Sequence, residues 1–297
     1  MKILIADGIS PYGQEILKKN GIEFHIQHYE HEELLQVIPE YDGILVRSAT
    51  KVTKDIIDAG KNLKLIARGG TGIDNIDHEY ARSKDIPVLN TPGANSASVA
   101  ELVFAHMFAL ARFIPQANIT MRRGEWNKKA YKGHELAGKT LGIIGFGRIG
   151  QIVARMALAF GMKVLVYDQM DNQTDLEVSA VSKDMLLRES DFITLHVPKE
   201  AQNLITKAEF ELMKPTVFII NSSRGGVINE DDLLEALRAG KIAGAGIDAF
   251  QNEPTPNPEL VNHPNVSVTP HIGASTKEAQ DRVGIQIAEK IVAVLKN

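Results

Sequence analysis

Three polar residues follow the last apolar runs of the chain or lie in the loops just beyond them. Arg224 and His271 each come a few residues after an apolar run, and Glu253 lies in a proline-rich stretch between them. Oxidation of an alcohol by hydride transfer to a nicotinamide needs a base for the hydroxyl proton, a partner that orients the base, and a cation for the substrate carboxylate. The three residues together predict such a catalytic trio, although each one alone could be an ordinary surface residue.

A glycine-rich turn in the stretch 141–168 supplies the site for a dinucleotide. The stretch is predicted to form strand, turn, helix and strand, and its turn has the spacing G-x-G-x-x-G. Gly145 allows a tight turn, Gly147 lets the backbone approach a pyrophosphate, and Gly150 lets the helix pack closely on the strand. The helix N-terminus offers N–H groups and partial positive charge to the phosphates. The alternative is a tight turn with no ligand.

Asp168 ends the second strand of this unit, 18 residues after Gly150, where a carboxylate can accept hydrogen bonds from both ribose hydroxyls. The same charge would repel the 2′-phosphate of NADP, and Gln169, Met170 and Asp171 provide no cation to receive it. We therefore predict NAD as the cofactor. The alternative is that Asp168 only begins a loop.

The first 90 residues alternate short apolar runs with helix-period segments, which is the pattern of a parallel α/β sheet. No glycine fingerprint follows the first strand, so this half is not expected to bind the dinucleotide itself. We predict strands over 3–6, 43–46, 63–67 and 87–89, and helices over 14–19, 53–59 and 76–83.

Two arginines stand at the ends of strands predicted in this half. Arg47 follows one strand, and Arg68 ends another beside a glycine-rich turn. Ligands of open α/β sheets collect at the carboxyl ends of the strands, so both arginines are placed to face the cofactor cleft. Guanidinium groups match phosphate oxygens, and we predict that these two bind a second anionic group of the substrate. The alternative is that they only hold strand ends.

A turn cluster over 90–93 marks the first predicted domain boundary. Ser98 is predicted to start a helix over 99–113, because a glutamate stands three residues later in capping-box spacing. A basic segment, 112–139, follows and is predicted to be irregular. It contains the only tryptophan, Trp126, and is either a solvated loop or the anchor of a subunit contact.

The second half continues the alternation of strands and helices. Its last helix follows the nucleotide-binding strands and is expected to cross back to the first domain. The predicted fold is α/β, with two doubly wound parallel-sheet domains: a Rossmann dinucleotide-binding domain (93–271) inserted in a flavodoxin-like substrate domain (1–92 and 272–297). We predict strands over 191–195, 217–221, 243–247 and 266–268, helices over 231–239 and 277–295, and a loop over 250–264.

The composition is that of an ordinary globular protein, with 297 residues, 44% hydrophobic and 24% charged residues, and a net charge of −4. The mild acidity argues against nucleic acid or an anionic membrane as the main partner. The chain has no cysteine, which excludes disulfides and thiolate ligands, and we expect no metal site. Asp7 comes too early for a signal peptide, and the apolar stretch 103–114 is too short to span a bilayer. We expect a cytoplasmic protein.

Seven stretches of the sequence carry a resemblance to a known family. The chain resembles the D-2-hydroxyacid dehydrogenase family over essentially its whole length, and three of the stretches (the first, the second and the last) are typical of the branch that acts on 3-phosphoglycerate. The stretches are VRSATKVT, ARGGTGIDNID, NTPGANSASVAE, GKTLGIIGFGRIG, NSSRGGVINE, AGAGIDAFQNEP and TPHIGASTKEAQ.

The resemblance implies a role for each residue of the trio. Arg224 would bind the substrate carboxylate and act as electrophile, His271 would be the acid/base, and Glu253 its partner. The resemblance also adds Lys128, reaching in from the other subunit, to the two substrate-binding arginines. The residues expected to bind NAD are Thr71, Gly145, Gly147, Arg148, Ile149, Gly150, Asp168, His196, Val197, Pro198, Ser222, Ser223, Asp248, Gly273 and Ala274.

The activity implied is NAD-dependent oxidation of 3-phosphoglycerate to 3-phosphohydroxypyruvate, the entry to serine biosynthesis, in a homodimer whose nucleotide domains pack together. A reductase for glyoxylate, hydroxypyruvate or another small 2-oxoacid is the alternative, and an NAD(H)-sensing corepressor that binds peptides is a distant one. Longer members carry a C-terminal regulatory domain that senses serine. Because this chain stops after the helix 277–295, we expect no allosteric inhibition by L-serine.

Overall fold

The chain forms two units, each built on a parallel sheet. The structure is a computed structural model that describes residues 1–170, 173–199 and 201–296. Asp171, one of the residues predicted to offer no cation to a 2′-phosphate, lies outside the described residues. Unit 1 comprises Met1–Asn95 and Ala274–Asn297, and unit 2 comprises Ser96–Gly273, where the sequence predicts boundaries after 92 and 271. The predicted class, α/β with two doubly wound parallel-sheet domains, is confirmed.

The sheet of unit 1 has the strand order β2-β1-β3-β4-β5, and every pair in it is parallel. Side chains alternate between its faces: Leu4 and Ile44 pack under α2, α3 and α4, whereas Ile5 and Leu45 pack under α1 and α12. The strands are β1 Lys2–Ile5, β2 Glu23–Ile26, β3 Gly43–Val46, β4 Leu65–Arg68 and β5 Val88–Leu89. The helices are α1 Pro11–Lys19, α2 His31–Val37, η1 Ile38–Glu40, α3 Lys54–Ala59, α4 His78–Ser83 and α12 Lys277–Lys296.

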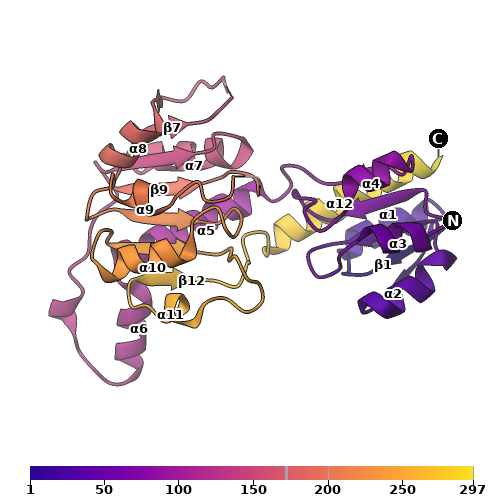
Figure 1. Cartoon of the computed structure of the whole chain (residues 1–297), viewed down its shortest axis with the longest axis horizontal. Coiled ribbons are helices and arrows are strands. Elements are labelled where there is room, and N and C mark those ends of the chain that lie inside the picture. The colour runs from indigo at the N-terminus through magenta and orange to yellow at the C-terminus, as the bar shows by residue number, and fades with distance from the viewer. Residues whose placement is uncertain (171–172, 200, 297) are drawn as a thin grey trace. The chain divides into compact units, whose positions relative to one another are not determined.

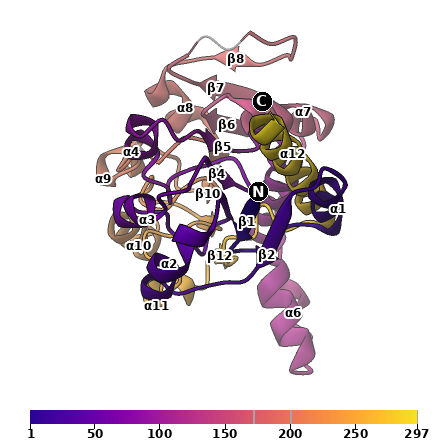
Figure 2. The ribbon, with the colours of Figure 1, turned by 90° about the vertical axis from the view of Figure 1, so that its right-hand side faces the viewer.

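Helix α12 belongs to unit 1, as the sequence predicts, and lies against α1 (Figure 2). The two helices approach closely because glycines stand at their contact. A Cβ added to Gly13 would lie 2.6 Å from the carbonyl oxygen of Gly284, and one added to Gly284 would overlap the hydroxyl of Ser10. The approach buries Ile287 and Ile291 completely in the core of unit 1.

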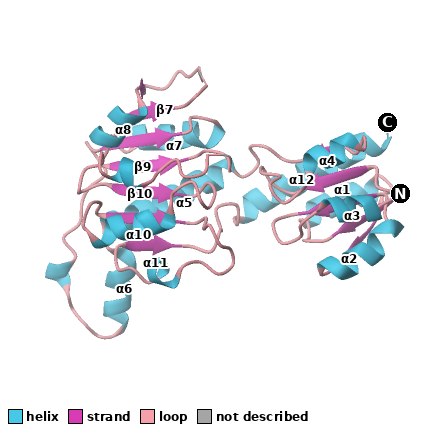
Figure 3. Ribbon diagram, in the orientation of Figure 1, coloured by secondary structure: helices cyan, strands magenta, loops and turns pink. Residues whose placement is uncertain are grey.

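The sheet of unit 2 has the order β12-β11-β10-β9-β6-β7-β8, again all parallel, with helices on both faces (Figures 1 and 3). The chain order reverses between β6 and β9, which is the switch point where ligands bind in such sheets. The strands are β6 Thr140–Ile144, β7 Lys163–Tyr167, β8 Ser179–Ala180, β9 Phe192–Leu195, β10 Phe218–Asn221, β11 Gly244–Ile247 and β12 Val266–Val268. The helices are α5 Ser96–Ala111, α6 Ile114–Arg122, η2 Lys128–Ala130, α7 Arg148–Ala159, α8 Lys183–Glu189, α9 Lys207–Phe210, α10 Glu230–Arg238 and α11 Pro258–Val261.

Three local predictions in unit 2 are wrong. Helix α5 begins at Ser96 rather than at Ser98, whose hydroxyl makes a long-range bond instead of a cap. The segment predicted as irregular contains α6, because Phe113 adopts a left-handed φ of 54° and the proline in the first turn of α6 restarts the helix. The predicted loop 250–264 contains the short helix α11, which is capped by Asn257.

No single helix among the described residues is long and apolar enough to cross a membrane. Helices α5 and α6 satisfy the criteria of length and composition only as a pair, and the chain bends by 63° between them.

Candidate active site

His271 and Glu253 form a hydrogen-bonded pair in unit 2. The Nδ1 atom of His271 lies 2.9 Å from both carboxylate oxygens of Glu253, and one of these oxygens also accepts the backbone N–H of Phe250 at 2.9 Å. A carboxylate accepts and does not donate, so Nδ1 must carry the hydrogen that it shares with Glu253. The other ring nitrogen, Nε2, is then the atom through which His271 can take or give a proton.

The electrostatics of the pair follow from this contact. The hydrogen bond and negative charge of Glu253 raise the pKa of His271, against burial and the positive charge of Arg224. Burial by itself would raise the pKa of Glu253, but the hydrogen bonds from His271 and from the Phe250 amide outweigh it, and the pKa of Glu253 is lowered. The pair therefore favours an imidazolium beside a carboxylate.

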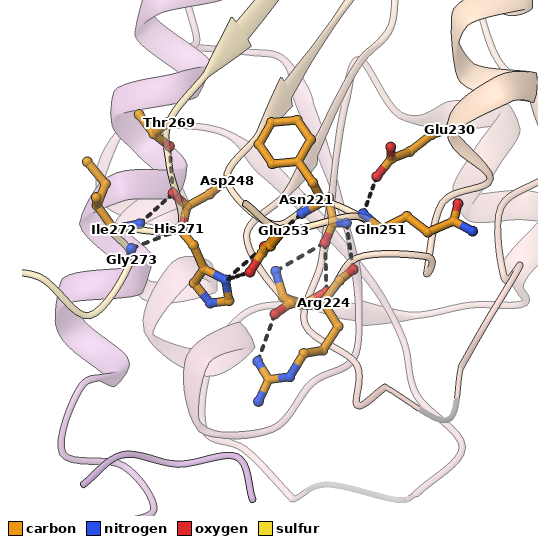
Figure 4. A network of polar contacts seen from close by, with 12 residues as sticks. Asn221, Arg224, Glu230, Asp248, Gln251, Glu253, Thr269, His271, Ile272 and Gly273 are labelled. Atoms are coloured by element: carbon orange, nitrogen blue, oxygen red, sulfur yellow. Dashed lines mark hydrogen bonds and ion pairs between the residues drawn. The ribbon is translucent and has the colours of Figure 1, made fainter. Parts of the chain in front are cut away.

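Arg224 lies in the turn after β10, near the pair (Figure 4). Its carbonyl oxygen accepts the side-chain amide of Asn221 at 2.8 Å, and its guanidinium donates to the carbonyl oxygen of Ser223 at 2.8 Å. Asn221 also accepts the hydroxyl and the backbone N–H of Ser223. The turn is thus hydrogen-bonded to Asn221, the last residue of β10, which fixes the backbone from which the Arg224 side chain extends.

The backbone at His271 is held in an unusual conformation. His271 has a φ of 52°, in the left-handed region that costs a non-glycine residue about 1 kcal/mol or more. The carboxylate of Asp248 stabilises it by accepting the hydroxyl of Thr269 at 2.6 Å, the N–H of Ile272 at 2.8 Å and the N–H of Gly273 at 2.9 Å (Figure 4). The carbonyl oxygen of Asp248 accepts the N–H of His271 itself. Strain that neighbouring residues maintain in this way is typical of functional sites.

Several residues that support the site were not predicted from the sequence. Ser98, inside α5, donates its hydroxyl to the carbonyl oxygen of Gly273 at 2.6 Å. Glu230, at the start of α10, accepts the backbone N–H of Gln251 at 2.5 Å and so holds the loop that carries Glu253 (Figure 4). Both contacts join distant parts of the chain, and no local pattern in the sequence signals them.

The glycine-rich turn has the geometry that a dinucleotide requires. Gly145 has a φ of 93°, and a Cβ there would overlap the carbonyl oxygen of His196, the residue just after β9. A Cβ on Gly150 would overlap the carbonyl oxygen of Gly145, whereas the space beside Gly147 is open. Helix α7 starts at the next residue and no side chain caps it, so its first N–H groups can receive a pyrophosphate. These residues fit NAD.

Asp168 stands at the end of β7, next to the turn. One carboxylate oxygen accepts the N–H of Phe146 at 2.5 Å and the other accepts the N–H of Met170 at 2.9 Å. Asp168 thus ties the strand end to the glycine-rich turn, in the place expected of the acid that binds the ribose.

The other residues expected at the cofactor lie at strand ends or in the turns beyond them. His196 follows β9; burial of its ring lowers its pKa to about 3, and its Nε2 lies 3.1 Å from the hydroxyl of Thr194. In unit 2, Arg148 and Ile149 are the first residues of α7, and Val197 and Pro198 follow His196. Ser222 and Ser223 are buried just after β10. The carboxylate of Asp248 accepts the backbone N–H of Gly273. Thr71 and Ala274 lie in unit 1, where the Thr71 hydroxyl donates to Asn95 at 2.8 Å.

The two arginines of unit 1 stand at neighbouring strand ends, with Arg68 paired in register to Val46, the residue before Arg47. The backbone N–H of Arg47 donates to the carboxylate of Asp7 at 2.6 Å. Burial lowers the pKa of Arg47, with the charge of Asp7 opposing. The guanidinium of Arg68 lies over Gly70, where a Cβ would overlap its Nη1. Lys128 is exposed in unit 2, on η2.

Comparison with known proteins identifies the family. The model of the D-isomer specific 2-hydroxyacid dehydrogenase NAD-binding domain matches residues 104–273. The chain belongs to this family. Both the predicted family and NAD as cofactor are thereby confirmed.

Three relatives illustrate the range of the family. Hydroxypyruvate reductase from Thermotoga maritima is 52% identical, over 94% of this chain and 92% of its own length. D-3-phosphoglycerate dehydrogenase from Archaeoglobus fulgidus is 46% identical over 100% of this chain, which spans only 58% of that protein. The crystal structure of D-lactate dehydrogenase from Aquifex aeolicus, complexed with NAD and lactic acid, matches with a TM-score of 0.88 and 31% identity, over 100% of this chain and 96% of that one.

Proposed function

We propose that this 2-hydroxyacid dehydrogenase interconverts 3-phosphoglycerate and 3-phosphohydroxypyruvate, with Arg224, Glu253 and His271 as its catalytic residues. The observation that carries the catalytic part is the His271–Glu253 pair, which leaves Nε2 to exchange a proton while Glu253 holds Nδ1 at 2.9 Å. The product of the oxidation would feed serine biosynthesis.

Each residue of the trio has a step in this proposal. In the direction of oxidation, the Nε2 atom of His271 accepts the proton of the substrate hydroxyl as C2 loses its hydride. NAD supplies the hydride acceptor when it is bound. Glu253 stabilises the imidazolium that forms, and Arg224 holds the substrate carboxylate beside the reacting carbon. Reduction runs the same steps backward, with protonated His271 as the acid.

Three basic side chains support a phosphorylated substrate. We propose that Arg47, Arg68 and, from a second subunit, Lys128 bind the phosphate, because guanidinium groups match phosphate oxygens and lysine adds a point charge. A second candidate is reduction of hydroxypyruvate, which the similarity to the Thermotoga maritima reductase favours. The two 2-oxoacids differ only by the phosphate on C3, so the choice depends on these cations.

Exposed side chains of the segment 112–139 in unit 2 support the proposal of a homodimer. Trp126 is 78% exposed, and Ile119 and Met121 on α6 are about half exposed. Aromatic and apolar side chains with this exposure are typical anchors of a subunit interface. Analytical ultracentrifugation of the protein and of Trp126→Ala should show a dimer and a weakened dimer; a monomeric native protein at assay concentration would contradict the proposal. The cytoplasmic location stays a prediction.

A substrate panel tests the proposed reaction. Initial rates with purified protein and NAD(H) should be compared for 3-phosphoglycerate, 2-hydroxyglutarate, glycerate, 3-phosphohydroxypyruvate, hydroxypyruvate, glyoxylate and pyruvate. We expect the highest kcat/KM for the phosphorylated pair. A higher kcat/KM for hydroxypyruvate or glyoxylate than for 3-phosphohydroxypyruvate would establish the second candidate, and no turnover of any of them would favour an NAD(H)-sensing binding protein.

A further inference from the structure

One buried histidine lies behind the loop that carries His271. His106, on α5, is only 2% exposed. Its Nδ1 lies 2.9 Å from the hydroxyl of Ser267 on β12, and its Nε2 lies 3.1 Å from the hydroxyl of Thr269, two residues before His271. Neither cofactor binding nor the catalytic trio accounts for a polar ring in this place.

The surrounding residues leave room for this ring. A Cβ added to Gly246, on β11, would lie 2.8 Å from the Cβ of His106, so only glycine fits there without a shift. Eight residues earlier on the same helix, Ser98 donates to the carbonyl oxygen of Gly273. Helix α5 therefore contacts the loop at two points, Thr269 before His271 in the sequence and Gly273 after it.

The hydrogen bonds around His106 can be ordered by counting donors. Thr269 has one hydroxyl hydrogen, and it goes to the carboxylate of Asp248 at 2.6 Å, an oxygen that can only accept it. Toward His106 the Thr269 oxygen can then only accept, so Nε2 carries the ring hydrogen. Nδ1 is left bare and accepts the hydroxyl of Ser267. Burial lowers the pKa of His106, against the charge of Asp248, in agreement with a neutral ring.

We propose that His106 is a positioning residue for the reaction: its Nε2–H fixes the hydroxyl of Thr269 on Asp248, and Asp248 in turn holds the backbone at His271. The loop needs this support because His271 has a φ of 52° and because three of the donors to Asp248 come from residues 269–273. The inference rests on the proposed acid/base role of His271.

Substitution of His106 tests the proposal. His106→Leu removes the donor at similar volume, and kcat should fall about fivefold to tenfold, the worth of roughly one hydrogen bond, while the KM for NAD changes little. His106→Gln keeps an N–H donor and should recover most of kcat. Met107→Leu, a buried and volume-conserving change on the same helix, should leave kcat unchanged. Native kcat in a folded His106→Leu protein would overturn the proposal.

A double-mutant cycle tests whether His106 acts through Thr269. Thr269→Val removes the hydroxyl at constant shape, and if the proposal holds, adding His106→Leu should lower kcat by no more than about twofold further. Losses that multiply would overturn it, because His106 would then act by another route.

The ring hydrogen gives a readout that is independent of activity. Nitrogen-15 NMR, with the His106 signals assigned by their loss in His106→Leu, should show Nε2–H and bare Nδ1 at neutral pH. The other tautomer, or an imidazolium, would mean that His106 does not donate to Thr269 as inferred and would overturn the proposal. His271→Ala separates the two proposals: native kcat there would refute the proposed function, whereas an inactive His271→Ala protein together with a fully active His106→Leu protein would refute only the role of His106.

Discussion

The two units use the same device at a strand end, with different results. In unit 1 the carboxylate of Asp7, just after β1, accepts the backbone N–H groups of Arg47 and Thr50 and the hydroxyl of Thr50. In unit 2 the carboxylate of Asp248, just after β11, accepts two backbone N–H groups and the hydroxyl of Thr269. Each carboxylate accepts hydrogen bonds from a loop that follows another strand, and these hydrogen bonds fix the loop.

The difference lies in what the fixed loop presents. The loop at Asp248 carries His271, whose hydrogen-bonded partner is Glu253, whereas the loop at Asp7 carries Arg47. Under the proposed function, unit 2 holds the groups that exchange a proton, and unit 1 holds a fixed positive charge that binds the phosphate. We infer that the carboxylate is a general means of ordering a loop, and that the residue carried by the loop determines whether it serves chemistry or charge recognition.

The largest expected effect tests the chemical side of this comparison. His271→Ala should lower kcat about 100-fold or more, the usual contribution of a general acid–base, with little change in NADH affinity. Steady-state rates and a fluorescence titration with NADH measure the two quantities. His134→Ala, at an exposed histidine in the same unit, serves as the control. Near-native kcat in His271→Ala would remove this residue from the mechanism.

The next effect tests the charge of unit 1. Arg68→Ala should cost about 2 kcal/mol in kcat/KM for 3-phosphohydroxypyruvate, of the order of one charge-assisted hydrogen bond, and far less for hydroxypyruvate. Arg82→Ala, at an exposed position on α4, is the matched control. The informative quantity is the ratio of the two losses. Equal losses for both substrates would mean that Arg68 serves the fold or the common carboxylate and not the phosphate.

Cofactor binding should depend on unit 2 through Asp168. Asp168→Asn keeps an acceptor for the N–H of Phe146 but removes the charge, so the Kd for NADH should rise about tenfold while that for NADPH changes less. Titration of both cofactors measures the gap between them. If the native protein binds NADPH as tightly as NADH, Asp168 does not select the cofactor.

Asp7 should matter to stability in a pH-dependent way. Burial would raise its pKa, but hydrogen bonds from Arg47 and Thr50 outweigh this, and the pKa is lowered. Its contribution is therefore complete above the pKa of an unfolded aspartate and is lost as the pH falls through the folded value. Asp7→Asn should destabilise the protein by about 1 kcal/mol at pH 7 and by less in acid.

Thermal unfolding at both pH values measures this effect. Asp77→Asn, at an exposed aspartate that accepts a single amide, should change the unfolding temperature far less. A pH-independent loss in Asp7→Asn would show that its charge is not what holds the loop.

The smallest change concerns the pair itself. Glu253→Gln removes the hydrogen-bonded negative charge that raises the pKa of His271, so that pKa should fall. Oxidation, which needs neutral His271, should then persist to lower pH, and reduction, which needs the protonated form, should be lost at lower pH than in the native enzyme. The pH–rate profiles in both directions measure the shift. Unshifted profiles would mean that His271 is not the titrating group.

The elements with apolar runs were predictable from the sequence, because a strand buried on both faces has little else in it. The edge strands β2 and β8 were not predicted, since both are largely exposed and lack such a run. The short helices α2 and α8 were not predicted either. At the site, the glycine spacing and the polar residues that follow strands identified the candidates.

The residues that hold the candidates in place were less accessible to sequence reasoning. Asp7 and Thr50 are 43 residues apart, and Ser98 and Gly273 are 175 apart. His106 stands in an apolar helix, and all that the sequence shows there is one polar residue among apolar ones. Such contacts depend on which strands become neighbours, and local patterns contain no information about that.

The placement of α12 has a consequence for synthesis on the ribosome. Unit 2 is one continuous stretch, whereas unit 1 is made at the two ends of the chain. Ile287 and Ile291 of α12 are fully buried in unit 1, on the sheet face that α1 also covers. That face of the sheet therefore stays partly exposed until these two residues have been synthesised. Domains generally fold as units during translation. Unit 1, although its strands are translated before unit 2, is therefore completed only after the nucleotide-binding unit that interrupts it.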